Sequence, residues 1–187
     1  MEQFTFFWKG KLSQWFLRDF IVDNVTYNCC EQFMMAQKAL LFKDTFTYNK
    51  IMSTSKPSEQ KALGREVQNF DNAIWMQQAK KIVYNGNFAK FSQHDDLKKL
   101  ILSTRGTTLV EASYEDSLWG IGLAETDDRA KDRKTWKGKN WLGETLTQVR
   151  EDIILLETVV SVPAVPDNDT EFKGFTTTKI NRKVGNN

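Results

Sequence analysis

The stretch 29–42 is almost wholly apolar after its first residues, and its spacing predicts a helix. Apolar side chains occupy every side of this helix, so no side is clearly exposed to water, and such a helix is usually buried. It nevertheless carries a carboxylate, two amides and an ammonium: Glu31, Gln32, Gln37 and Lys38. Burial of these groups costs free energy unless each finds a partner. Glu31 and Lys38 fall on the same side, about 10.5 Å apart along the axis, so a ligand could lie between them.

The apolar spacing predicts further helices, separated by turn residues. Asp71 is a suitable N-cap for one of them, and Asn140 is a good N-cap for the last. The sequence Asn85-Gly-Asn87 interrupts the helix that Asp71 opens, and Arg105-Gly106 ends the next. The predicted helical ranges are 45–52, 57–69, 71–84, 88–104 and 140–156.

Short runs of β-branched and aromatic residues predict strands at 4–8 and 109–113, and a hairpin over 20–27. Residues 119–124 form a further strand or an extended loop. We therefore predict a mainly helical α+β fold, with a small antiparallel β element, as a single compact domain over residues 1–157. Residues 158–187 are polar with little apolar periodicity, and we expect a flexible tail there.

Composition adds bounds to this picture. The chain of 187 residues suits one domain, and its net charge of +2 is too small to indicate nucleic acid by itself. The only two cysteines, Cys29 and Cys30, are adjacent and so poorly placed to pair, which favours a reducing, cytoplasmic setting. No signal peptide or membrane-spanning segment is visible. The sequence leaves the oligomeric state open.

Five polar groups stand out as candidates for chemistry: Glu31, Lys38, Glu111, Asp116 and Asn140. One His and two adjacent Cys cannot make a zinc site, and Gly120-Ile-Gly122 lacks the third glycine of a dinucleotide fingerprint. We therefore predict neither a metal nor a cofactor. Acid–base work then falls to carboxylates and lysine. Buried carboxylates with tryptophan walls suit the cleavage of a glycosidic bond.

Simpler interpretations of the same residues stay open. Glu31 suits the first turn of its helix, where acids are favoured, and Lys38 could extend its amine to solvent. Asp116 could be only a turn residue, and Trp75 only part of the core. The basic loop 129–139 is either a solvated face or a contact for phosphate or DNA.

The chain resembles the NADAR family over residues 6–150. The family's central motif has the form Glu-His-aromatic-Phe-x-Ala-Gln-Lys, with Gln32 here in place of the His, and its early Ser-Asn-Phe is Ser13-Gln-Trp15 here. Each motif alone is weak, whereas six in order are specific. They are Glu31-Gln-Phe-Met-Met-Ala-Gln-Lys38, Leu63-Gly-Arg65, Phe70-Asp71 with Trp75, Lys90-Phe91, Leu109–Ser113 with Asp116 and Trp119-Gly-Ile-Gly122, and Trp136-Lys-Gly-Lys-Asn140-Trp-Leu-Gly143.

The resemblance implies hydrolysis of an N-glycosidic bond to a ribose. Glu31 and Asp116 would be the acid–base pair. Lys38 would hold a phosphate or hydroxyl, or attack C1′ of the ring-opened ribose to form a Schiff base. Tryptophans would stack on base or ribose, arginines would meet phosphates, and Glu111 and Asn140 would bind hydroxyls or a base edge. The expected substrate contacts are Ser13, Trp15, Arg18, Gln37, Arg65, Trp75, Glu111, Trp119, Gly120, Asn140 and Gly143.

Two substrate classes are associated with the family. One is ADP-ribose attached to guanine in nucleic acid, whose removal reverses DNA ADP-ribosylation in an anti-toxin or anti-defence role. The other is the phosphorylated ribosylamino-pyrimidine intermediates of riboflavin synthesis. The basic loop, the aromatic segment 12–20 and the changed motif residues favour the first. ADP-ribosylated DNA is therefore a candidate partner. A non-catalytic module that binds ADP-ribose or another nucleotide is the second alternative.

Overall fold

The computed structural model describes residues 2–160, except for the side chain of Val160. Most of the tail expected at 158–187 lies outside this part. Within it, helices dominate two small two-stranded sheets, which confirms the mainly helical α+β fold. The elements are β1 (Phe4–Phe7), β2 (Phe20–Val22), β3 (Val25–Tyr27), α1 (Cys30–Leu41), α2 (Thr45–Ser53), α3 (Pro57–Arg65), α4 (Asn72–Gln93), α5 (Asp95–Ser103), β4 (Thr108–Glu111), the 3-10 turns η1 (Asp128–Lys131) and η2 (Arg133–Thr135), and α6 (Trp141–Val160).

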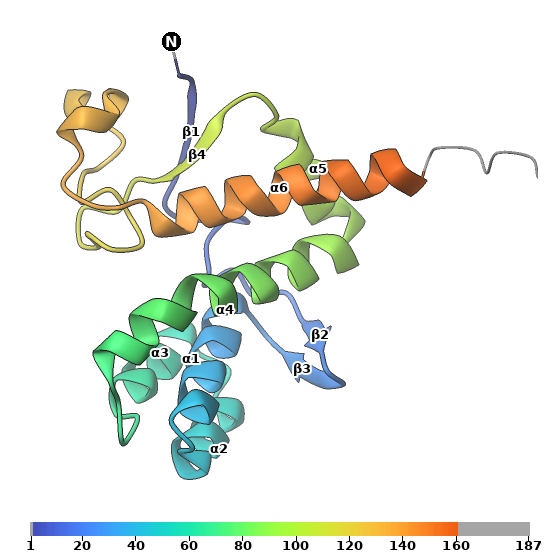
Figure 1. The fold of residues 1–187 in the computed structure, drawn as a ribbon, viewed down its shortest axis with the longest axis vertical. Helices are drawn as coiled ribbons and strands as arrows, with labels where there is room; N and C mark the ends of the chain where they lie inside the picture. Colours follow the sequence, from blue (N-terminus) through green and yellow to red (C-terminus); the bar gives the residue numbers. More distant parts are fainter. Residues whose placement is uncertain (1, 161–187) are drawn as a thin grey trace, which may run out of the picture.

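The helices form two groups that meet along α4. Figure 1 shows α1, α2 and α3 at one end of the molecule, and α6 with β1 and β4 at the other. Helix α4 packs against α1 on one side and against α6 on the other. One large core cluster contains buried residues from both groups, so the described part folds as a unit. No helix within residues 2–160 is both long and apolar enough to cross a membrane.

The first two turns of helix α1 are buried as the sequence predicts, whereas Leu40 near its end is exposed. Its residues from Cys30 to Ala36 are all buried, although they include two polar side chains. Gln32 is satisfied by backbone: its amide nitrogen donates to Ile51 O at 3.2 Å, and its oxygen accepts from Asn28 N at 2.7 Å. Gln32 therefore joins α1 to its neighbours, and Glu31 is the buried side chain left to explain.

Helix α4 corrects one prediction. The sequence Asn85-Gly-Asn87 was expected to interrupt a helix, yet α4 continues through it to Gln93. Gly86 is present because α1 packs closely there: a Cβ at this position would lie 2.5 Å from the Phe33 ring. Asn87 turns its amide back to Val83 O at 2.8 Å. A close helix contact, rather than a turn, explains this glycine.

The strands form one antiparallel and one parallel pair. The hairpin β2–β3 turns at Asp23 and Asn24 as predicted, and both have positive φ (49° and 62°), which asparagine and aspartate tolerate best among non-glycine residues. Strands β1 and β4 pair in parallel, an arrangement that the sequence did not predict. Their register sets Phe7 opposite Glu111. Residues 119–124 form a loop rather than a strand.

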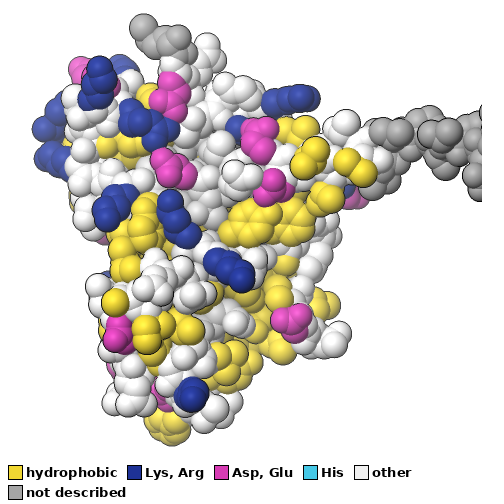
Figure 2. Space-filling model, viewed as in Figure 1, with side chains coloured by type: hydrophobic (Ala, Val, Ile, Leu, Met, Phe, Trp, Pro, Cys, Tyr) yellow, Lys and Arg dark blue, Asp and Glu magenta, His cyan; other side chains and the backbone are white. Residues whose placement is uncertain are grey.

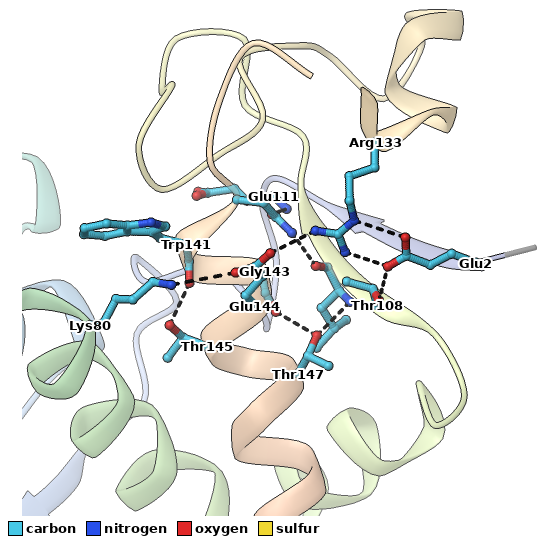
Figure 3. A network of polar contacts seen from close by, with 12 residues as sticks. Glu2, Lys80, Thr108, Glu111, Arg133, Trp141, Gly143, Glu144, Thr145 and Thr147 are labelled. Carbon is cyan, nitrogen blue, oxygen red and sulfur yellow. Dashed lines mark hydrogen bonds and ion pairs between the residues drawn. The ribbon is translucent and has the colours of Figure 1, made fainter. Parts of the chain in front are cut away.

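The basic loop 129–139 is fastened to the body of the domain by ion pairs. Figure 2 shows Lys and Arg side chains gathered at the upper left, where Figure 1 places η1 and η2. Arg133 reaches Glu2 at 2.6 Å and Glu144 at 2.9 Å (Figure 3). Arg129 pairs with Asp127 at 2.7 Å. Much of the positive charge is thus balanced locally, as expected for a solvated face.

Candidate active site

A cavity of about 830 Å³ opens where the two groups of helices meet. Its wall is built from α1, α3, the first turns of α4, the end of β4, and the loops around residues 8–17 and 113–119. Most residues expected at the substrate line it, although they come from distant parts of the sequence. They are Ser13, Trp15, Glu31, Lys38, Arg65, Trp75, Glu111, Asp116 and Trp119.

Two expected contacts, Arg18 and Gln37, lie outside this cavity. Arg18 donates to Asp96 at 3.0 Å and to the His94 ring at 3.1 Å on the surface of the domain. Gln37 donates to the Tyr27 hydroxyl at 3.3 Å. Both side chains are therefore engaged with protein groups away from the cavity wall.

Three more expected contacts lie behind the wall. The Asn140 amide donates to Leu109 O and accepts from Glu111 N, both at 2.9 Å, and the residue is fully buried. Gly143 and Gly120 pack against the same strand: a Cβ would lie 2.2 Å from Leu109 O and 3.0 Å from Glu111 O, respectively. These residues hold the end of β4 in place and do not line the cavity. The Asn140 side chain bonds β4 instead of capping α6.

Glu31 lies in the first turn of α1 and is 5% exposed. Burial raises the pKa of its carboxyl to about 7, and the nearby Asp116 charge adds to this effect. Lys61 and the bond from Trp15 Nε1 to Glu31 Oε2, at 3.2 Å, act in the opposite direction. Glu31 therefore holds its proton near neutral pH and can donate it to a leaving group.

Glu111 and Asp116 complete a group of three carboxyls. Burial raises the pKa of Glu111 to about 8, and the charge of Asp116 contributes next. Asp116 Oδ1 accepts from Leu118 N at 2.9 Å and from Trp119 N at 2.7 Å. Asp116 is thus a turn residue, as the simpler interpretation of the sequence held, and it also lines the cavity. Two backbone donors fix its carboxylate in the cavity wall.

Lys38 also lines the cavity and does not extend into solvent. Its Nζ donates to Gly64 O at 2.8 Å and lies 4.2 Å from the centre of the Phe70 ring. The amine lies 5.5 Å from the centre of the Trp75 ring. Burial, followed by the positive charge of Arg65, lowers the pKa of Lys38. An amine with a lowered pKa is a better nucleophile at neutral pH.

Sequence reasoning missed several cavity residues, of which Lys61 matters most. Lys61 stands one helical turn before Arg65 on α3, so the two share a face. Its Nζ lies 5.9 Å from the centre of the Trp15 ring, and its charge lowers the pKa of Glu31 and of Glu111. The four-residue spacing to Arg65 was the available signal. Trp8 and Gln14 also line the cavity.

Replacing Lys61 with Met should move the alkaline limb of the pH–rate profile to higher pH. Lys61 lowers the pKa of Glu31, so without it Glu31 keeps its proton to a higher pH. The profile of kcat/KM against pH reports this group in the free enzyme. Lys61→Arg keeps the charge and should keep the wild-type limb. An unchanged limb in Lys61→Met would show that Lys61 does not set the protonation of Glu31.

The cavity combines a buried acid, three further carboxyls, four cations and aromatic walls, which suits a glycosidase. Comparison with known proteins agrees. The chain belongs to the NADAR family, because the NADAR domain model matches residues 6–154. The NMR structure of the E. coli protein YbiA superposes with a TM-score of 0.70 and 26% identity, covering 84% of this chain and 89% of that one.

Curated relatives define the class of enzyme. The chain is 45% identical over 145 residues to the N-glycosidase R617 of Acanthamoeba polyphaga mimivirus, covering 75% of this chain and 85% of that protein. It is 30% identical over 134 residues to the N-glycosidase YbiA of Escherichia coli (strain K12), covering 72% of this chain and 75% of that protein. The protein is therefore a glycosidase that acts on N-glycosyl compounds.

Proposed function

We propose that the enzyme hydrolyses the N-glycosidic bond between a base and an ADP-ribose, with ADP-ribosylated guanine in nucleic acid as the substrate. Such a reaction would reverse DNA ADP-ribosylation. The observation that carries the proposal is the cavity: at about 830 Å³ it falls in the upper part of the range for ligand sites, roughly 300–1,000 Å³. Four cations line it, Lys9, Lys38, Lys61 and Arg65, and cations of this kind bind phosphate oxygens.

The carboxyls divide the acid–base work in this proposal. Glu31, whose pKa burial raises to about 7, keeps its proton below that pH and gives it to the departing base nitrogen. Asp116, held by two backbone donors, faces the positive charge that develops on the ribose or takes a proton from the attacking water. Trp15 positions the Glu31 carboxyl through its indole N–H. Trp119 and Trp75 supply flat surfaces for base and ribose.

Lys38 offers a covalent variant of the same reaction. The N-glycoside opens to an imine between C1′ and the base nitrogen, and the neutral Lys38 amine adds to C1′. Expulsion of the protonated base nitrogen leaves a Schiff base on Lys38, which water hydrolyses to free sugar and amine. The half-buried position and lowered pKa of Lys38 suit this step. Otherwise the ammonium binds a phosphate or hydroxyl.

Borohydride separates these two roles of Lys38. If the Schiff base forms, reduction during turnover will trap a sugar–enzyme adduct, seen as a mass increase on the peptide that contains Lys38. Lys38→Arg keeps a positive charge for phosphate but removes the nucleophile, and should give no adduct. An active enzyme that yields no adduct, together with an active Lys38→Arg variant, would assign Lys38 to binding alone.

The substrate is tested by direct comparison. The enzyme is incubated with DNA that carries ADP-ribosylated guanine and, separately, with a ribosylaminopyrimidine phosphate, and mass spectrometry follows the released bases. We expect restored guanine and free ADP-ribose from the first. Release only from the second would instead assign the enzyme to ribosylamino-pyrimidine phosphates. Release from neither would refute both assignments.

In this proposal the basic loop is an outer surface of the domain and supplies no side chain to the cavity. No residue from 124 to 139 lines the cavity among those that the structure describes. Arg129 and Arg133, moreover, already have acidic partners. The support for a large phosphorylated substrate therefore comes from the cavity and not from the loop, and contact between the loop and DNA stays a prediction.

A further inference from the structure

Two buried polar atoms in the cavity wall lack a partner. Within residues 2–160 the buried side-chain atoms without a hydrogen bond are Gln14 Nε2 and Glu111 Oε2. Both residues line the same cavity, although they lie on different segments of the chain. A buried donor or acceptor without a partner costs about 1–3 kcal/mol. Two such atoms on one cavity wall leave a donor and an acceptor with which a bound group can pair.

The surroundings of Gln14 fix which end of its amide is free. The side chain is 9% exposed, and its oxygen accepts from Asn87 Nδ2 at 3.4 Å. Asn87 is itself oriented by its bond to Val83 O, so it presents a donor to Gln14. The backbone oxygen of Gln14 accepts from Glu31 N at 3.0 Å. The amide nitrogen therefore remains as a donor, next to the residue that carries the catalytic acid.

Both backbone polar groups of Glu111 are also hydrogen-bonded within the protein. Its N–H donates to Asn140 at 2.9 Å, and its carbonyl accepts from Ile121 N at 3.0 Å. Only the carboxyl is left to face the cavity. Since burial and the Asp116 charge raise its pKa to about 8, this carboxyl donates a hydrogen bond when protonated and accepts one when ionised.

We infer that Gln14 and Glu111 together bind the vicinal hydroxyls of the substrate ribose. A hydroxyl oxygen accepts from the Gln14 amide, and a hydroxyl pairs with Glu111 in either protonation state, because it both donates and accepts. A phosphate only accepts, so it could pair with Glu111 only while this carboxyl keeps its proton, and the ionised carboxylate above about pH 8 would repel it. The inference rests on the proposed function for the identity of the ribose and assigns Gln14 a role in sugar specificity.

Binding of simple sugar phosphates tests the inference without turnover. Calorimetry compares ribose 5-phosphate with its 2-deoxy and 3-deoxy forms on the wild type and on Gln14→Met. The wild type should bind ribose 5-phosphate more tightly than either deoxy form, by about tenfold for one hydrogen bond. In Gln14→Met the preference over one deoxy form should disappear. The exposed Gln77 supplies the control, and Gln77→Met should keep both preferences.

A stability measurement excludes a merely structural role. Gln14→Met removes an unpartnered buried donor together with an acceptor whose bond from Asn87 Nδ2 is long, at 3.4 Å, while that Nδ2 keeps its bond to Val83 O, so the Tm should stay close to that of the wild type. Equal binding of ribose and both deoxy sugars by the wild type would overturn the inference, and so would full preference in Gln14→Met. If sugar preference is found but neither glycoside is cleaved, the proposed function fails while the hydroxyl site stands.

Discussion

Glu31→Gln should lower kcat by about 10²- to 10⁴-fold, the usual contribution of a general acid. Glutamine keeps the size of the side chain and can still accept from Trp15 Nε1, but it carries no proton to give to the leaving base. In the wild type the acid is protonated below about pH 7, so the wild-type rate should fall as pH rises through that value. Steady-state kinetics on either glycoside measures both effects.

The same substitution should remove a pH dependence of stability. The Glu31 carboxyl has an ordinary pKa of 4.5 and a folded value of about 7. The contribution of this protonated carboxyl to the free energy of unfolding is fully present below about pH 4.5. It is lost as pH rises through 7, a change of roughly 3 kcal/mol. Glu31→Gln should therefore unfold at a urea concentration that changes less between pH 5 and pH 8, a range set by this shift.

Glu125 provides the matched control. It is an exposed carboxyl in the loop that precedes η1, and it does not line the cavity. Glu125→Gln should leave both kcat and the pH dependence of stability at wild-type values. A folded Glu31→Gln variant with full activity would remove Glu31 from the reaction and leave Glu111 as the acid to examine.

The buried polar helix was predictable because its evidence is local. An apolar run that holds Glu31 and Lys38 on one side predicts burial from a few turns of sequence alone. The hairpin turn at Asp23-Asn24 was predictable for the same reason. Gly86 was misjudged because its cause is not local: the Phe33 ring that it accommodates belongs to another helix.

The cavity wall was harder to predict, because the role of each residue there depends on its hydrogen-bond partners in the folded protein. Asn140 has a polar side chain at a helix start, which suits a cap or a ligand, but the parallel β1–β4 pair brings Leu109 and Glu111 to its amide. Gln14 gave no periodic signal, and its importance comes from an unpartnered amide. Facts of this kind depend on tertiary contacts that one sequence does not display.

Gly143→Ala should destabilise the protein by about 3 kcal/mol, at the upper end for overpacking. The new methyl would lie 2.2 Å from Leu109 O and 2.4 Å from Asn140 Oδ1. Leu109 O is a backbone atom of a buried strand, and Asn140 Oδ1 accepts from Glu111 N, so neither can move away without breaking a bond that fixes β4. Urea unfolding measures the loss.

Gly106→Ala separates a steric clash from the ordinary effect of replacing a glycine. Gly106 has a positive φ of 84°, and no atom lies within 4 Å of the position that an alanine methyl would occupy. Alanine there should therefore cost only about 1 kcal/mol of backbone strain.

Equal destabilisation by Gly143→Ala and Gly106→Ala would contradict the close packing of α6 on β4. A larger loss at Gly143, accompanied by reduced kcat, would instead show that this contact positions Glu111. That result would follow from the structure, because Asn140 bonds Glu111 N directly.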